Sequence, residues 1–456
     1  MVKLSKLGLR ETFGTPGVAN KIFWTLFLLA LTRLGTFVPI PGIDSSILWT
    51  YMHPGQNVLI NANGFFERLK YIFSPSSRAE LEFLNFFSGG AFSNFSVLML
   101  GVMPYISAQI IIQILMVIIP KLREMAKDPA GSAKLQRWMR YSTIIVCLIQ
   151  ATAVLFYAKS IDGLLTVDMG LFVPIALISC TAGSMFMLWI GERITDKGVG
   201  NGVSLLIFAG IVARIPEAIV SIYNGVKADT INIIGIVVLL AIFIVVVLFV
   251  IYEETGERRI YVTYSKRIVG RKVYGAQTTH IPFKLNPSGV IPVIFASALL
   301  SFPLQIATML GGNVAWLRSF ASWLNPQGAA YIIIYTLLII AFAFFYTQVS
   351  LNPIEIAQQI RENGGTIQGV RPDKIEDYLT KILNRIVLPG SLFLAFIALL
   401  PTIVQIVFKF PQNVAMLLGG TSLLIMVGVE LETMRALEGI VKSQVRLISD
   451  KSKVHK

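Results

Sequence analysis

Residues 231–252 read INIIGIVVLLAIFIVVVLFVIY, an uninterrupted apolar run without one charged side chain. A helix needs about 20 mostly apolar residues to cross the hydrocarbon core of a bilayer. A strand of a membrane barrel would instead alternate apolar and polar residues over about 10 positions. This stretch therefore predicts a transmembrane helix, and it sets the fold class for the rest of the chain.

The composition of the whole chain agrees with that prediction. Hydrophobic residues make up 55% of the 456 residues and charged residues only 14%, whereas a soluble protein carries about 25% charged residues. We predict an all-α polytopic membrane protein with ten transmembrane helices. The predicted spans are 22–40, 98–119, 141–158, 171–190, 203–222, 231–252, 289–310, 330–350, 386–408 and 413–430.

The lysines and arginines predict the orientation of these helices, because loops on the cytoplasmic side carry an excess of both. With the N-terminus inside, 30 of the 39 basic residues fall in inside segments and 7 in outside loops. We therefore expect a multi-pass protein of the cytoplasmic (inner) membrane with both termini in the cytoplasm. The net charge of +14 then reflects contact with anionic lipids, and nucleic acid becomes at most a secondary partner, through the ribosome.

Residue sets for enzyme or cofactor chemistry are missing from the sequence. Cys147 and Cys180 lie in separate apolar runs and act as small hydrophobes, and the histidines are scattered. No phosphate loop, helix-borne metal pair or nucleophile–base set is present, so we expect no enzyme, no cofactor and no metal. Ion-coupled carriers need ionisable groups within their spans, whereas Arg33 has no acidic neighbour in its own span. A passage is favoured, and a ten-helix secondary transporter of a small solute is the alternative.

Residues 86–114 read FFSGGAFSNFSVLMLGVMPYISAQIIIQI. The apolar run breaks at Ser88-Gly89-Gly90, restarts, and meets Gly101 and Pro104 before a full span. The pieces before Gly101 are too short to cross a bilayer. They fit an interfacial helix on the outer surface, or a half-helix that folds back into a cavity, and spacing alone favours the first.

Three loops carry further patterns. Residues 189–208 contain the turn GVGNG, which we interpret as a tight helix–helix connection with Asn201 capping the next helix. The loop 253–288 alternates basic pairs with β-forming residues, which predicts a short hairpin able to dock an acidic partner or RNA phosphate. The loop 351–385 places Arg371 on a rigid turn before Pro372, where it is either a contact residue or simply solvated.

The sequence resembles the SecY/Sec61-alpha family, the channel subunits of Sec protein translocases. The resemblance runs through the whole chain. Its most distinctive stretches are RLGTFVPIPGID at 33–44, FSGGAFSNFSVLMLGVMPYISAQIIIQ at 87–113, the segments 191–208, 258–296 and 352–378, and GGTSLLI at 419–425.

The resemblance implies two pseudo-symmetric halves of five helices each, residues 1–222 and 223–430, followed by a cytoplasmic tail, 431–456. An hourglass pore would run between the halves. Its waist would be a ring of aliphatic side chains, which match Val102, Ile106, Val203, Ile207, Ile294 and Ile425. Such a ring can yield to a passing chain and still resist wetting.

A short re-entrant plug helix at about 84–97 is also implied, in place of the interfacial helix. Its residues would be Phe86, Phe87, Ser88, Gly89, Gly90, Ala91, Phe92, Ser93, Asn94 and Phe95. A lateral gate would open near Gln109, Gln113, Ser297 and Ser301. Docking of the motor or ribosome would use Arg259, Lys266, Arg271 and Arg371.

The function implied by the resemblance is a protein-conducting channel for unfolded preproteins and for membrane proteins that leave sideways into lipid. The expected partners are the SecE and SecG subunits, the SecA motor ATPase, the ribosome, signal peptides and nascent polypeptides, anionic lipids and an accessory membrane insertase. Three features depart from the family pattern. The first outside loop has an apparent insertion within 51–82, valine stands at 102 and 203, and Glu430 and Glu432 have no assigned role.

Overall fold

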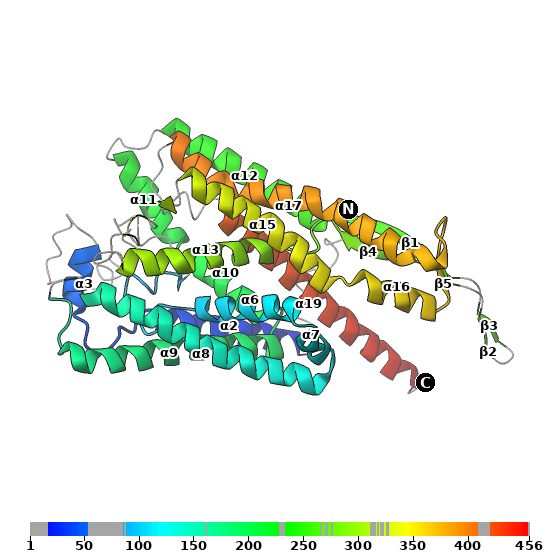
Figure 1. The fold of residues 1–456 in the computed structure, drawn as a ribbon, viewed down its shortest axis with the longest axis horizontal. Helices are drawn as coiled ribbons and strands as arrows, with labels where there is room; N and C mark the ends of the chain where they lie inside the picture. The colour runs from blue at the N-terminus through cyan, green and yellow to red at the C-terminus, as the bar shows by residue number, and fades with distance from the viewer. Residues whose placement is uncertain are drawn as a thin grey trace.

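The computed structural model describes residues 17–52, 85, 88–159, 161, 163–227, 233–264, 267–269, 272–274, 277–310, 316, 319, 323–324, 328–408 and 420–454. The molecule is elongated and almost entirely helical, with a small sheet at one end (Figure 1). The elements are α2 (Val18–Gly35), α3 (Ser45–Met52), α6 (Met103–Ile118), α7 (Pro120–Lys127), α8 (Pro129–Lys159), α9 (Met169–Lys197), α10 (Gly202–Ala213), α11 (Ile215–Lys227), α12 (Ile233–Thr255), β1 (Glu257–Tyr264), β2 (Arg267–Val269), β3 (Lys272–Tyr274), β4 (Gln277–Lys284), α13 (Ile291–Leu310), α15 (Ala329–Ser350), α16 (Pro353–Glu362), β5 (Gly365–Ile367), the 3-10 helix η2 (Pro372–Lys374), α17 (Ile375–Phe408) and α19 (Gly420–Val454).

Each predicted span overlaps one or two of these helices, and residues 413–419 of the last span lie outside the described residues. Within the described ranges, seven helical stretches are long and apolar enough to cross a membrane. The stretches Met103–Met116 and Pro120–Lys127 are bent by 108° at a short break and make an eighth if they count as one span. The predicted all-helical membrane class is therefore confirmed, and the count of ten spans stays a prediction.

Two layers of helices enclose a central row. Figure 1 shows α12, α15 and α17 along one edge and α2, α8 and α9 along the other, with α10, α13 and α19 between them. Across the predicted boundary between residues 1–222 and 223–430, α13 packs against α6 and α8, and α10 packs against α19. That division into halves stays a prediction. Most of these helices contribute to one central hydrophobic cluster.

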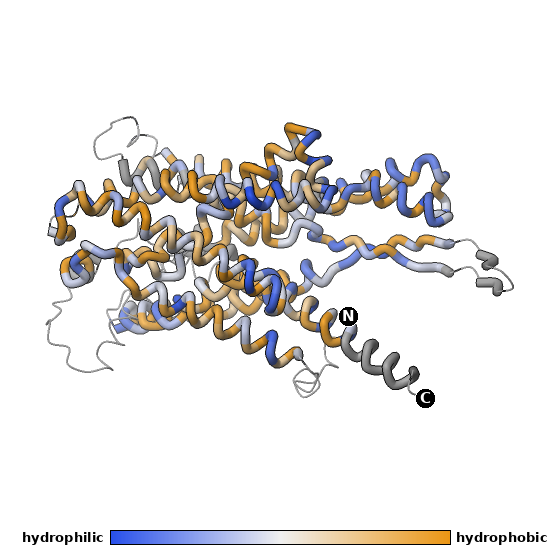
Figure 2. The backbone as a smooth tube through the Cα atoms, turned by 90° about the horizontal axis from the view of Figure 1, so that it is seen from below, coloured by the Kyte–Doolittle hydropathy of each residue, from blue (hydrophilic) through white to orange (hydrophobic). Residues whose placement is uncertain are grey.

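A three-stranded sheet closes one end of the molecule. Strand β1 pairs antiparallel with β4 from Glu257–Lys284 to Tyr264–Gln277, and its other edge pairs with β5. Residues buried between the sheet, α16 and the start of α17 form a separate cluster. We call β1, β4, β5, α16 and residues 375–386 the platform. In Figure 2 the long strands extend well past the membrane-type helices, which are mostly orange.

The predicted hairpin in the loop 253–288 is confirmed, and it is longer than expected. Strands β1 and β4 are eight residues each, and the short pair β2–β3 lies beyond them toward the tip. Strand β5 comes from the other long loop, which the sequence pattern did not assign to a sheet. The two loops are therefore parts of one structure.

Several helices differ in length from the predicted spans. The predicted span 203–222 is two helices, α10 and α11, because the chain turns at Arg214 just before Pro216. The helices α8 and α17 begin at Pro129 and Ile375, about three turns earlier than their apolar portions. The predicted tail 431–456 continues α19 as helix to Val454. Hydropathy detects only the apolar part of such helices.

Helix α17 takes part in two clusters. Its residues Ile375, Leu379 and Ile386 belong to the platform cluster, whereas Leu394 and Ile397 belong to the central cluster. At 34 residues it is about 51 Å long, against about 30 Å for the hydrocarbon core of a bilayer. One helix therefore joins the platform to the membrane-type core.

Candidate functional site

The six aliphatic side chains of the predicted ring all belong to the central cluster or pack against it. We call them the waist. They come from the segment before α6 and from α6, α10, α13 and α19: Val102, Ile106, Val203, Ile207, Ile294 and Ile425. All are buried except Val203, which is partly buried and packs against the others of the cluster. The structure thus places the predicted residues in or against one large cluster, and their arrangement as a ring and their role in a pore stay a proposal.

Local sequence determines where two of the helices that carry waist residues begin. Helix α6 begins at Met103 because Gly101, at φ 54°, turns the chain and Pro104 suits the first helical turn. Helix α10 begins after Asn201, whose side-chain oxygen accepts hydrogen bonds from the amides of Val203 and Ser204 at 3.1 and 3.4 Å. The predicted Asn201 cap is confirmed.

The chain before the waist is a buried run of turns. Residues 89–102 form turns and one isolated bridge, so the expected plug helix is not present in this stretch. Residues 85 and 88 are helical, and we call residues 89–101 the turn segment. Phe92 and Phe95 are almost fully buried in a second hydrophobic cluster, which contradicts an interfacial helix on the outer surface. Phe86 and Phe87 lie outside the described residues.

Short polar contacts hold the turn segment in shape. The side-chain oxygen of Asn85 accepts a hydrogen bond from the Ser93 amide at 3.0 Å, and Ser88 Oγ accepts one from the Phe92 amide at 3.1 Å. The Ile40 amide donates to the Phe95 carbonyl at 2.9 Å, which ties the segment to the chain after α2. Side-chain and loop hydrogen bonds, rather than helical ones, stabilise this segment. Such bonds cannot be predicted from the hydropathy of the sequence.

Gly89 lies between two helices. Arg33 of α2 donates a hydrogen bond from Nη1 to the Gly89 carbonyl at 3.3 Å. A Cβ at Gly89 would lie 2.6 Å from that nitrogen and 2.8 Å from the Cα of Gly210 on α10. With φ at 63°, Gly89 also has a backbone conformation that side chains disfavour.

The predicted gate residues lie on two helices that pack together, α6 and α13. Ser297 and Ser301 are buried, and their hydroxyls donate to carbonyls of their own helix at 2.8 and 3.1 Å. Gln109 and Gln113 are partly buried, and the side-chain oxygen of Gln113 has no hydrogen-bond partner among the described residues. The elements are brought together, and a gating role stays a proposal.

The predicted docking residues lie on or beside the platform. Arg259 on β1 is exposed, and its Nε donates to Glu257 at 2.8 Å. Arg371 is exposed at the start of η2, and its carbonyl accepts the Lys374 amide at 2.9 Å. Lys266 and Arg271 lie outside the described residues. Because β5 pairs with β1, the two long loops present Arg259 and Arg371 on one body.

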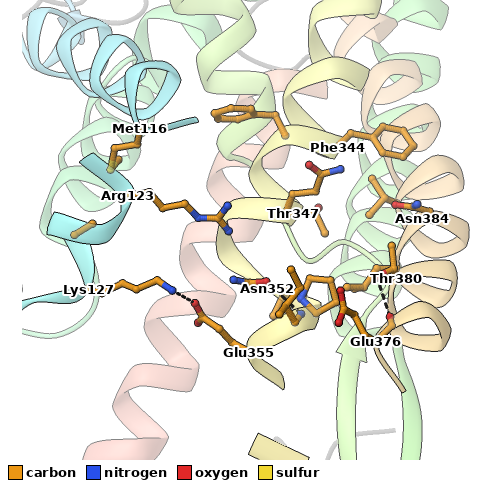
Figure 3. Close-up of a pocket in the computed structure, with 18 residues that line it drawn as sticks. Met116, Arg123, Lys127, Phe344, Thr347, Asn352, Glu355, Glu376, Thr380 and Asn384 are labelled. Carbon is orange, nitrogen blue, oxygen red and sulfur yellow. Dashed lines mark hydrogen bonds and ion pairs between the residues drawn. The ribbon is translucent and has the colours of Figure 1, made fainter. Parts of the chain in front are cut away.

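A cavity of about 500 Å³ separates α6 and α7 from α15, α16 and α17. Figure 3 shows Arg123 extending into it from α7, opposite Thr347 and Asn352. At its rim Lys127 Nζ and Glu355 Oε1 form an ion pair at 2.5 Å. Sequence analysis missed this cavity, because its walls come from segments more than 200 residues apart.

Sequence analysis also missed a buried polar network where α12 meets α19. Asn286 Nδ2 donates to Glu254 Oε1 at 3.1 Å and to the Gly289 carbonyl at 3.0 Å. Arg435 Nη2 donates to the Glu254 carbonyl at 2.8 Å. Glu253 is also buried there, and neither of its carboxylate oxygens has a hydrogen-bond partner among the described residues. Over the part of the chain that the structure describes, no group of His, Cys, Asp and Glu could hold a metal ion.

Comparison with known proteins decides which family has this arrangement. The SecY family model matches residues 96–434. The protein translocase subunit SecY of Borreliella burgdorferi is 39% identical over 434 residues, which cover 95% of this chain and 94% of that protein. The chain belongs to the SecY family. The SecY of Escherichia coli K12 is 36% identical, over 97% of this chain and 96% of that protein.

Solved structures agree with the SecY fold. The structure described as "The structure of a protein conducting channel" has a TM-score of 0.62 at 20% identity and covers 93% of each chain. "Sec61 in the Canine ribosome-channel complex from the endoplasmic reticulum" has a TM-score of 0.60 at 19% identity and covers 93% of each chain. SecY membership makes the chain a membrane protein of a channel family for protein translocation, rather than of an enzyme family. It does not favour the small-solute transporter.

Proposed function

We propose that the chain is the protein-conducting channel of a Sec translocase in the cytoplasmic membrane, with both termini in the cytoplasm. Unfolded preproteins would cross between the two halves, and apolar helices would leave sideways between α6 and α13. The observation that carries the proposal is the waist. Aliphatic side chains from separate elements converge in one buried cluster, directly after a buried segment without regular structure.

The chemistry of the waist suits a passage for many sequences. An apolar constriction resists wetting and therefore ion leak, and aliphatic side chains bind no particular polypeptide tightly. The turn segment would be the plug of the resting channel. A segment held by turns rather than by a continuous helix can move without breaking a helical hydrogen-bond ladder, so its displacement costs less than that of a transmembrane helix.

The platform would dock the partners that drive translocation. Its exposed Arg259 and Arg371 can contact acidic side chains or RNA phosphates. We propose the SecA motor and the ribosome as the occupants. Two structural neighbours support the ribosome: the canine Sec61 complex, and the structure described as an "idle yeast Ssh1 complex bound to the yeast 80S ribosome". SecE, SecG, signal peptides, anionic lipids and an accessory insertase complete the proposed partners.

Ion conductance of the purified protein in planar bilayers tests the proposal. We compare the wild type with a variant that lacks Phe86–Phe95 and with a variant of the waist, Ile207→Asn. The deletion is expected to produce large openings that the wild type lacks, and Ile207→Asn is expected to produce smaller leaks because a polar side chain wets the constriction. Silence of both variants, with uptake of a small solute by the wild type, would overturn the channel and support the transporter.

A further inference from the structure

Arg33 is a charged side chain in the last turn of a membrane-type helix. Its Nε is buried without a hydrogen-bond partner among the described residues. None of the ion pairs formed between described residues involves it. Its one hydrogen bond to another segment that the structure gives runs from Nη1 to the Gly89 carbonyl. Burying a charged side chain within a membrane-type helix costs free energy, so such a residue is by default a candidate for a functional role.

Gly89 has two close neighbours. The Arg33 guanidinium and the backbone of Gly210 on α10 both lie within 3 Å of the position that a Cβ would take. The spacing leaves no room for a Cβ at Gly89, whereas a Cβ at Gly90 would meet nothing within 4 Å. Gly89 is therefore a second place at which the turn segment is held, in addition to the hydrogen bond between Ile40 and Phe95.

Gly210 connects this contact to the waist. It follows Ile207 by three residues on α10, so both lie on the same face of the helix, about 4.5 Å apart along its axis. If the turn segment leaves, the guanidinium loses its carbonyl partner beside the waist. The cost of an unpaired charge in a poorly hydrated place then opposes departure.

We propose that Arg33 is a positioning residue that holds the turn segment in its resting place through the Gly89 carbonyl. The proposal rests on the proposed function, in which the turn segment is the plug. Arg33 is thereby a determinant of how often the resting channel opens. It touches neither the passing polypeptide nor a driving partner in this role.

Resting conductance of the full chain in planar bilayers is the test. Arg33→Met keeps an unbranched apolar stem, two atoms shorter than arginine, and removes the charge and the donors. We expect an open fraction about tenfold above the wild type, which corresponds to about 1.4 kcal/mol. Arg33→Lys keeps the charge and is expected to lie between the two. Gly89→Ala is expected to open the channel as Arg33→Met does, because its methyl group displaces the guanidinium or the Gly210 backbone.

Two controls separate this role from a general loss of stability. Gly90→Ala introduces the same kind of backbone strain, at φ 89°, without the close contacts, and is expected to leak much less than Gly89→Ala. In a chain that lacks Phe86–Phe95, Arg33→Met has no carbonyl to release and is expected to change the conductance less than twofold.

The outcomes are distinguishable. Equal leaks from Gly89→Ala and Gly90→Ala, or a further leak from Arg33→Met in the deletion background, would overturn the positioning role. A conducting deletion variant together with a silent Arg33→Met would overturn it as well and leave the proposed function standing. A silent deletion variant would overturn the plug itself, and the role of Arg33 with it. If Arg33→Met does not fold, the two glycine variants decide the question.

Discussion

The side chain of Asn286 connects several segments of the chain through hydrogen bonds. It is almost fully buried and links β4 to the end of α12 through Glu254, and its side-chain oxygen accepts a hydrogen bond from Ser288 at 2.9 Å. Since its amide also donates to the Gly289 carbonyl, both amide hydrogens and the side-chain oxygen have a hydrogen-bond partner. Removing it leaves the buried Glu254 carboxylate with one donor fewer.

We expect Asn286→Leu to destabilise the protein by about 1–3 kcal/mol, the usual cost of an unsatisfied buried partner. Asn363→Leu is the matched control, because Asn363 is exposed directly after α16 and its side chain donates one hydrogen bond, to the Gln359 carbonyl of that helix. It is expected to cost less than about 0.5 kcal/mol. Thermal unfolding in detergent measures both, and equal shifts in the midpoint would contradict the role of the network.

The asparagines Asn201 and Asn286 show which side-chain hydrogen bonds can be predicted from the sequence and which cannot. The Asn201 cap could be predicted because its partners are the next two or three amides of the chain. The partner of Asn286 is 32 residues away, and the partner of Arg33 is a backbone carbonyl 56 residues away. A carbonyl has no signature in the sequence, so the candidate site could be named only by resemblance and its contacts could not be named at all.

Strand β1 is the central strand of the platform sheet. Its alternation places Ile260 and Val262 in the platform cluster and leaves Tyr261 61% exposed. Val262 is fully buried and stands opposite Thr279 of β4 and Ile367 of β5. This one position therefore touches both long loops of the chain.

A charge at Val262 should loosen the platform without unfolding the membrane-type core. We expect Val262→Asp to make residues 257–284 and 351–374 accessible to protease and to abolish partner docking, because a buried unpaired carboxylate costs several kcal/mol. Tyr261→Asp, one residue away on the exposed face, should leave the cleavage pattern unchanged. Cleavage confined to the first loop in Val262→Asp would contradict a shared sheet.

Prediction from sequence works well for the helices and poorly for the platform. Each span has an apolar run long enough to predict a helix. In residues 257–264, basic residues are followed by β-forming residues, which predicts a strand. Strand β5 is only three residues long and pairs with a strand more than 100 residues earlier. Whether β5 joins the platform sheet depends on a tertiary contact with β1, and no local sequence pattern predicts that contact.

The ion pair between Lys127 and Glu355 joins the two predicted halves across the cavity of Figure 3. Both side chains are about half exposed. The attraction is therefore worth no more than about 1 kcal/mol and weakens with salt. In the proposed channel, whose halves would part during transport, even this small term would favour the closed arrangement.

We expect Lys127→Glu to raise the resting open fraction up to about fivefold, because two carboxylates then face each other across the cavity. Adding Glu355→Lys should restore the wild-type conductance by reversing the pair. Lys121→Glu changes the same charge on the same helix, away from Glu355, and serves as the control. A double variant that leaks as much as Lys127→Glu would contradict a bond between the halves.

The course of α17 has a mechanical consequence. Pro389 lies inside this helix, between its platform residues and its residues in the central cluster. A proline has no amide hydrogen, so the Arg385 carbonyl has no helical donor four residues later, and helices bend most easily at such a position. Between platform and core, α17 therefore has one position at which bending costs least. Under the proposed function, a load on the platform would be taken up first as a bend at Pro389, before it displaced the residues of the waist.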